Sequence, residues 1–257
     1  MPKWTAFPYP DKQYVYTEAA LKKQWARLHR GDCEPFPKDK AVVQAWIAYH
    51  AGDFASAYDA GLAAGPAGYN AAHKAALIHA NYLETAEKKK LDLLSEVGAR
   101  CDELQAADPR NANAFYLYAY AMGRYSQGIS ITKALAQGLG GKVRDALQTT
   151  LKLQPKHADA HIAFGAWHAE IIDKVGSMIG GMTYGAKRDE AIRHYETALE
   201  LNPDSAIART EFADGLVMLD GKKALKRAEQ LYAEAAAIEP ADAMERLDVE
   251  QARSEIE

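Results

Sequence analysis

Four of the eight histidines lie close together in the sequence and could form a metal site. His157 and His161 are four residues apart and His168 follows seven residues later, so on a helix they can share a face. With His194 and one of the acidic residues Asp159, Glu170 or Glu190 nearby, they would offer the nitrogen and oxygen ligands that zinc prefers. The His-Glu-x-x-His motif of zinc enzymes does not occur. A metal or small-ligand site at His161 and His168 is therefore the alternative to a structural role.

Two glycine-rich segments could be taken for phosphate-binding loops. In residues 138–143, Val143 stands where such a loop needs Ser or Thr, and no strand precedes the segment. The glycines of residues 176–185 do not have the Gly-x-Gly-x-x-Gly spacing of a dinucleotide-binding turn. Both segments are interpreted as flexible crossings between helices.

The nucleophiles of hydrolytic enzymes lack the sequence context that would activate them. There is no Gly-x-Ser-x-Gly motif, and Cys101 lies on the apolar side of an expected helix. Cys33 follows His29 and Arg30 but has no further catalytic partner nearby in the sequence. Many carboxylates are spaced for helical ion pairs, as Glu84 is with Lys88. We predict that the protein is not an enzyme and needs no cofactor.

Composition narrows the class of protein further. The 257 residues carry 31 Lys and Arg against 35 Asp and Glu, which gives a net charge of -4 and no basic surface for nucleic acid. No apolar run approaches the ~20 residues that span a bilayer, so membrane insertion is not expected. The first residues do not have the pattern of a signal peptide, and the two cysteines are far apart. These features predict a cytoplasmic protein.

The elements that would position these residues are predicted to be helices. Ala, Leu, Glu, Lys and Gln dominate the chain, whereas runs of strand formers are scarce. Pro109, Pro155, Pro203 and Pro240 each follow an apolar, alanine-rich segment, at intervals of 46, 48 and 37 residues. Because proline cannot continue a helix, each one marks a helix end. The spacing predicts an all-α chain made of a repeated helical unit.

The segments before three of these prolines share one pattern. Residues 191–203 and 228–240 both read small-x3-Tyr-x2-Ala before their proline, and residues 143–155 are a degenerate copy. This pattern resembles the second helix of the tetratricopeptide repeat (TPR). The resemblance implies a right-handed solenoid of about five helix pairs over residues 37–240. It also places His161 and His168 at aromatic packing positions of a first helix, which favours the structural role.

Two repeats exceed the usual length because of insertions at residues 123–142 and 173–186. Each is interpreted as an extended first helix followed by a glycine-rich crossing, and both should lie on one face of the solenoid, often the binding face. The pattern Thr183-Tyr184-x2-Lys187-x2-Glu190-Ala191 is similar to the helical-repeat region of regulator of microtubule dynamics proteins. That similarity covers residues 110–220, and only the fold is inferred from it.

The two ends of the chain are predicted to cap this repeat domain. Residues 1–36 are rich in aromatic residues and proline, and a helix should run from a Thr17 N-cap to about Arg30, with Gly31 ending it. This segment covers the first repeat or, alternatively, packs on a second copy of the chain and makes a homo-oligomer. Residues 241–257 should form a charged C-terminal capping helix.

In a TPR array the first helices line the concave side, so the resemblance also implies a set of partner-binding residues. These are Asn113, Tyr116, Tyr120, Asp159, Ile162, Ala166, Thr210 and Asp214. The mixture lacks the Lys, Asn and Arg set that clamps a C-terminal carboxylate, and it fits a peptide with apolar anchors better. Tyr116 and Tyr120 are the expected hot spots.

Three functions remain open at this stage. The leading hypothesis is a non-catalytic adaptor that binds a peptide or protein segment in the concave groove. The alternative is a small-molecule or metal-binding repeat protein with a pocket near His161, His168 and Tyr184. The third is a structural subunit that assembles with itself through the aromatic N-terminal arm.

Overall fold

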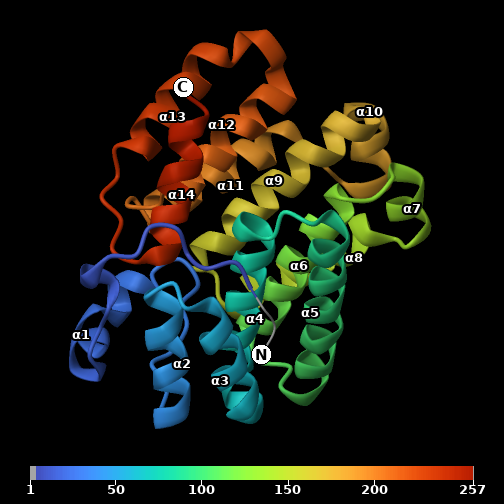
Figure 1. The fold of residues 1–257 in the computed structure, drawn as a ribbon. Helices are drawn as coiled ribbons and strands as arrows, with labels where there is room; N and C mark the ends of the chain where they lie inside the picture. The colour runs from blue at the N-terminus through green and yellow to red at the C-terminus, as the bar shows by residue number, and fades with distance from the viewer. Residues whose placement is uncertain (1–3, 257) are drawn as a thin grey trace.

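The computed structural model describes residues 4–256, and every regular element in this range is helical (Figure 1). Ten of the helices form five antiparallel pairs, as the repeat pattern predicted. The pairs are α2 (Lys40–His50) with α3 (Phe54–Ala63), α4 (Tyr69–Ile78) with α5 (Glu87–Ala107), α6 (Ala112–Gln127) with α8 (Leu139–Leu153), α9 (Ala158–Val175) with α11 (Arg188–Leu201), and α12 (Ala206–Asp220) with α13 (Leu225–Ala236).

Local sequence signals explain where these helices begin and end. The side chains of Asn111 and Ser205 accept hydrogen bonds from amides in the first turns of α6 and α12, which satisfies donors that a helix leaves free. Pro155 and Pro203 follow the last residues of α8 and α11 and prevent either helix from continuing. Helix α1 (Glu18–Leu28) begins after its Thr17 cap, as expected, and ends two residues before Arg30.

Small residues allow neighbouring helices to approach closely in the stack. A Cβ atom on Gly165 of α9 would lie 2.9 Å from the ring of Tyr195 in α11. A Cβ atom on Gly215 of α12 would lie 2.6 Å from the hydroxyl oxygen of the same tyrosine. Ala191 and Ala198 of α11 are fully buried in the same cluster. Tyr195 is therefore clamped between two glycines, and this packing joins the fourth helix pair to the fifth.

The insertions contain more helix than the sequence analysis expected. Helix α6 stops at Gln127, and a separate short helix, α7 (Ile131–Ala136), occupies the middle of the first insertion. Gly138 has a φ of 65°, and α8 begins directly after it, so the predicted crossing through residue 142 is wrong in its last four residues. In the second insertion, α9 ends at Val175 with Gly176 as its C-cap, and α10 (Ser177–Ile179) and a π-helical turn (Gly180–Tyr184) follow.

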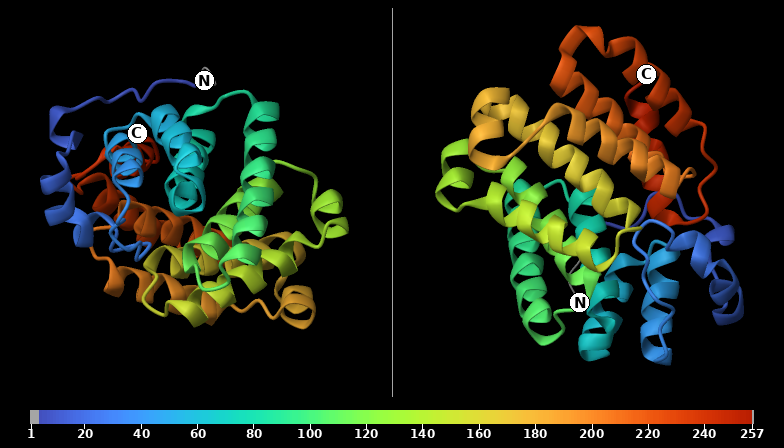
Figure 2. Two further views of the ribbon diagram at one scale, coloured as in Figure 1. Left: turned by 90° about the horizontal axis from the view of Figure 1, so that it is seen from below. Right: turned by 180° about the vertical axis from the view of Figure 1, so that it is seen from behind.

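The two ends of the chain meet and close the superhelix into a ring. The last helix, α14 (Ala243–Ser254), packs on α12 and α13 as a cap and also contacts α2 (Figure 1). Tyr16 in the N-terminal segment donates a hydrogen bond of 2.7 Å to the carbonyl oxygen of Ala241. Arg27 of α1 binds Glu245 of α14 through two hydrogen bonds. Seen from below, the blue N-terminal segment runs beside the red C-terminal helix (Figure 2).

The aromatic side chains of the N-terminal segment pack on the chain's own first repeats. Trp4 stacks on His79 with ring centroids 4.3 Å apart, and Phe7 meets Phe54 edge to face. Trp25 is buried against Trp46 of α2. These contacts are the ones that a cap on the first repeat requires. Between residues 4 and 256 the structure has no helix that combines the length and apolarity needed to cross a membrane.

Candidate functional site: a cavity inside the ring

A cavity of about 300 Å³ lies inside the ring formed by the inner helices. The first helices of four pairs line it, namely α4, α6, α9 and α12, and α14 contributes Met244 and Asp248. Both insertions reach it as well: α7 supplies Ile131 and Leu135, and the turn after α10 supplies Tyr184. The cavity thus brings together residues from nearly the whole length of the chain.

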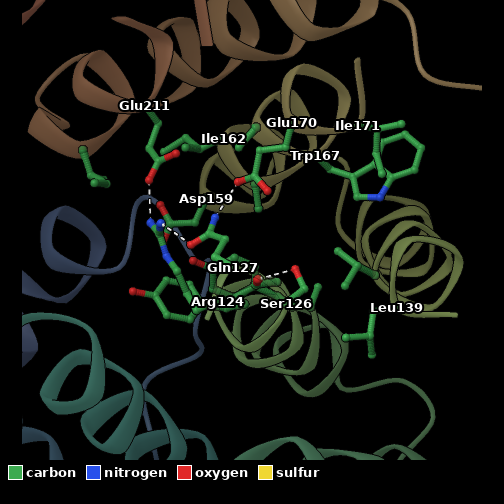
Figure 3. Close-up of a pocket in the computed structure, with 18 of the residues that line it drawn as sticks. Arg124, Ser126, Gln127, Leu139, Asp159, Ile162, Trp167, Glu170, Ile171 and Glu211 are labelled. Carbon is green, nitrogen blue, oxygen red and sulfur yellow. Dashed lines mark hydrogen bonds and ion pairs between the residues drawn. The ribbon is translucent and has the colours of Figure 1, made fainter. Parts of the chain in front are cut away.

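One end of the cavity is apolar. Leu139, Trp167 and Ile171 form its wall in Figure 3. The indole nitrogen of Trp167 donates to the carbonyl oxygen of Gly140 at 2.8 Å, so the ring is held against the start of α8. Gly140 itself lies close to the ring of Tyr184, where a Cβ atom would be 3.0 Å away. The two insertions therefore meet at this end.

The opposite end is polar, and its cations are paired with carboxylates. Arg124 of α6 donates to Glu211 of α12 and lies 5.6 Å from the ring centroid of Tyr120 (Figure 3). This carboxylate raises the pKa of Arg124, although burial opposes the shift. Beside Ile171 on α9, Glu170 accepts from Gln127 and forms an ion pair of 3.2 Å with Lys174. Each of these charges is thus compensated, Arg124 by a carboxylate of another inner helix and Lys174 within α9.

Asp159 is the exception among the charged groups of the cavity. It lies in the first turn of α9 and is half-buried, with its exposed surface opening into the cavity. The described part of the chain supplies no hydrogen-bond donor to its carboxylate. Burial raises the pKa of Asp159 to about 6, although the nearby Lys74 ammonium opposes the shift.

A chain of buried ionic contacts closes the ring next to the polar end. Lys74 binds Asp32, which also accepts from Nδ1 of His29 at 2.9 Å. The Nε2 atoms of His29 and His50 lie 3.3 Å apart, and Nδ1 of His50 donates to Asp242 at 2.6 Å. We call these five residues the seam, because they join α1, α2 and α4 to the N-cap of α14. All five are buried.

A second carboxylate of the N-terminal segment lies against the inner helices. Glu34 accepts hydrogen bonds from the side-chain amides of Asn70 and Asn113, at 2.9 and 2.6 Å. Burial raises the pKa of Glu34 to about 7. Asn113 also contacts Nε2 of His157 at 2.9 Å through its amide oxygen. The residues after α1 therefore cover part of the concave face from inside the same chain.

Five of the eight residues expected to bind a partner line the cavity: Tyr116, Tyr120, Asp159, Ile162 and Ala166. Asn113 is buried beside the cavity and is held by Glu34. Thr210 is buried and donates to the carbonyl oxygen of Ala206 in its own helix. Asp214 lies outside the lining and accepts from Tyr232, and burial raises the pKa of Asp214 to about 6. Whether any of the eight binds a partner stays a prediction.

Several lining residues were not singled out in the sequence. Glu170 was considered only as a neighbour of the histidines, and Lys74, Arg124 and Glu211 were not considered. Arg124 is four residues after Tyr120, which the repeat places on the inner side, so the same helical face continues to Arg124. Lys74 lies in a repeat for which no inward positions had been assigned, and its partner Asp32 comes from outside the repeats.

The histidine cluster lies apart from the cavity lining. Nδ1 of His161 lies 2.8 Å from Nδ1 of His194 in α11, and His168 accepts from the amide of Lys187. Burial lowers the pKa of His168 to about 4 and that of His194 to about 3, which keeps both rings neutral at pH 7. Over residues 4–256, no three His, Cys, Asp or Glu side chains are grouped as metal ligands. Of His161, His168 and Tyr184, the three residues expected to form a ligand pocket, Tyr184 alone lines the cavity.

Comparisons with known proteins agree with this architecture. A structure search finds a thermophilic TPR protein of Thermus thermophilus, which is 18% identical. The match covers 84% of this chain and 98% of that one, with a TM-score of 0.58, and it supports the TPR-like fold. No curated protein sequence matches the chain.

The family model for Regulator of microtubule dynamics protein 1-3 matches residues 63–256. The match extends well beyond the residues 110–220 in which the similarity was noticed, and it includes both insertions and α14. The chain therefore belongs to the family of Regulator of microtubule dynamics protein 1-3.

Proposed function

We propose that the protein is a non-catalytic adaptor that binds an apolar segment of a partner protein at the mouth of the cavity. The TPR-like fold supports a helical repeat protein of the protein-interaction type. The observation that carries the binding mode is the position of Ile131 and Leu135 on α7. Both side chains are about half exposed, at 51% and 50%, and both also line the cavity.

Further apolar side chains are exposed on the second insertion. Met178, Ile179 and Met182 are 74%, 54% and 84% exposed. Methionine is flexible and polarizable, and it is common on surfaces that adapt to a partner. The two insertions lie at the same end of the molecule in Figures 1 and 2. An apolar anchor of the partner would pass between α7 and the start of α8 and contact Ile162 and Ala166 inside.

The chemistry of the lining supports binding rather than turnover. Arg124, Lys174 and Lys74 are each engaged with a carboxylate, so they are held in place as structural charges. Tyr116 is buried, and both Tyr116 and Tyr120 line the inside of the cavity. In this proposal these two tyrosines therefore contact the partner through a side chain that enters the cavity. The free thiols Cys33 and Cys101 support action in a reducing compartment such as the cytoplasm.

Affinity capture with the purified full-length chain tests this function. Capture from an extract of the native cells should recover a partner, and Leu135→Asp should reduce the recovered amount at least tenfold. Leu225→Asp is the matched control, because Leu225 is 45% exposed on α13 and does not line the cavity. If Leu135→Asp captured as much of the same partner as Leu225→Asp, the proposed binding mode would be wrong.

A further inference from the structure

Among the charged groups in and around the cavity, one carboxylate has no paired cation. Arg124 pairs with Glu211, Lys174 with Glu170, and Lys74 with Asp32. Glu245 is paired with Arg27, and Asp248 accepts from Tyr82 while burial raises its pKa well above the usual range. Asp159 faces the same space without a donor from the described residues. A ligand that pairs with Asp159 must therefore supply the missing donor, and a cationic donor suits a carboxylate best.

We infer that the cavity binds a primary alkylammonium ion, with the ammonium group at Asp159 and the alkyl chain between Leu139, Trp167 and Ile171. This ligand class goes beyond the proposed adaptor function, and it can be tested without any partner protein. A primary alkylammonium group can come from either of two sources, a free amine or the lysine side chain of a bound segment.

Aromatic rings support a cationic head group at this position. Tyr116 and Tyr120 line the polar end, four residues apart on α6, with ring centroids 6.3 Å apart. A cation over the face of a tyrosine ring is stabilised by the quadrupole of the ring, more strongly where water is excluded. Tyr120 already holds the Arg124 guanidinium in this way. Tyr116, which packs against His157 with ring centroids 4.6 Å apart, lines the same cavity as Asp159 and offers a second ring to a cation there.

The shape of the cavity supports an apolar body attached to this head group. Its volume of about 300 Å³ lies at the small end of the range for ligand pockets. The wall opposite Asp159 consists of Leu139, Trp167 and Ile171 (Figure 3). An anionic head group would instead have to break an existing ion pair of Lys74, Arg124 or Lys174. The arrangement thus favours an alkylammonium over a fatty acid of the same length.

The pH dependence of binding follows from the groups that face Asp159. These are Lys74 of α4, Asp32 of the segment after α1, Tyr116 of α6 and Glu245 of α14. Asp159 must lose its proton to pair with the ammonium, while an alkylamine stays protonated well above pH 7. Affinity should therefore rise as the pH increases from 5 to 7, through the pKa of about 6.

Titration calorimetry of the full-length protein with n-octylamine hydrochloride tests the inference. We expect one octylammonium ion per chain at pH 7, and weaker binding of n-octanol and octanoate. Asp159→Asn should weaken octylammonium binding at least tenfold, whereas Asp159→Glu, which keeps the charge, should retain it. Asp214→Asn is the matched control. Asp214 is a half-buried acid with a similarly raised pKa, and it lies outside the lining.

A peptide arm distinguishes the two sources of the ammonium group. A capped Leu-Leu-Lys-Leu peptide is compared with its analogue that has norleucine in place of lysine. Preference for the lysine peptide over free octylamine would assign the site to a partner's lysine, and the reverse preference would assign it to a small amine.

Thermal unfolding of each variant shows whether a loss of binding reflects misfolding. The inference is overturned if octanoate binds as tightly as octylammonium, if correctly folded Asp159→Asn binds like the wild type, or if neither amine probe binds. The adaptor function would survive each of these results, because its test depends on Leu135 and not on Asp159.

Discussion

The seam and the stacked helix pairs hold the ring together with opposite kinds of side chain. Between α9, α11 and α12, two glycines and buried alanines enclose the ring of Tyr195, and the contacts are almost entirely apolar. In the seam, ionic and imidazole groups meet in a buried chain from Lys74 to Asp242. The stack depends on close packing, which repeats along the chain, whereas the seam depends on individual pairs that occur once.

This difference predicts how each region responds to a small change. Apolar packing loses a graded amount of energy when a contact is altered. A buried ion pair that loses one partner leaves the other charge without compensation, which costs more. The seam should therefore be the more sensitive region, although it contains fewer residues.

The largest effect is expected from Asp32→Ala. The substitution leaves the buried Lys74 ammonium without its carboxylate and removes the acceptor of His29. We expect the free energy of unfolding to fall by about 3–5 kcal/mol, as for other buried pairs that lose a partner. Urea unfolding followed by circular dichroism measures it. Glu190→Ala, which removes an exposed pair with Arg193, is the control and should change stability far less.

A smaller effect is expected from Gly165→Ala in the stack. The new methyl group would press on the ring of Tyr195, which is fixed on its other side by Gly215. Overpacking of this kind costs about 1–3 kcal/mol. Gly141→Ala is the control, since Gly141 lies in α8 with open space around its Cβ position. There the substitution should stabilise the helix by up to ~1 kcal/mol. Equal losses in both variants would contradict the role assigned to Gly165.

The smallest effect concerns His194, a polar group within the stack. Its pKa is lowered to about 3 by burial, so the unfolded chain binds a proton more readily below pH 6.5, and acid destabilises the folded state. His194→Asn removes this contribution. We expect the variant to lose about 1–2 kcal/mol less stability than the wild type between pH 7 and pH 5.5, given ~1.4 kcal/mol per pKa unit. Identical pH profiles from urea unfolding would show that His194 is not buried in neutral form.

The comparison also explains what could be predicted from the sequence. The stack was predictable, because the small-x3-Tyr-x2-Ala pattern and the prolines recur in register, and each repeat carries its own signal. The Thr17 cap of α1 was predictable for the same reason, since capping is a local property. Tyr116, Tyr120 and Ile162 were placed on the inner side by counting along the repeat, and they line the cavity.

The seam had no such signal. Asp32 and Lys74 are 42 residues apart, and His50 and Asp242 are 192 apart, so no periodic spacing connects them. The histidines that drew attention in the sequence, His161 and His168, are packing residues between α9 and α11. His29 and His50, which lie in the seam, have no histidine near them in the sequence. Residues that act through one long-range partner are the ones that pattern reading misses.

A double-mutant cycle between Arg27 and Glu245 tests most directly whether the two ends of the chain close the ring. These residues are 218 positions apart and share two hydrogen bonds, of 2.5 and 3.1 Å. The cycle uses Arg27→Gln, Glu245→Gln and the double variant. The amide oxygen introduced at position 245 can still accept from the backbone amide of Ala241, so the start of α14 is preserved. A closed ring predicts a coupling energy of about 0.5–3 kcal/mol in urea unfolding. If the losses in unfolding free energy of the two single variants add up to that of the double variant within about 0.5 kcal/mol, α1 and α14 do not meet in solution.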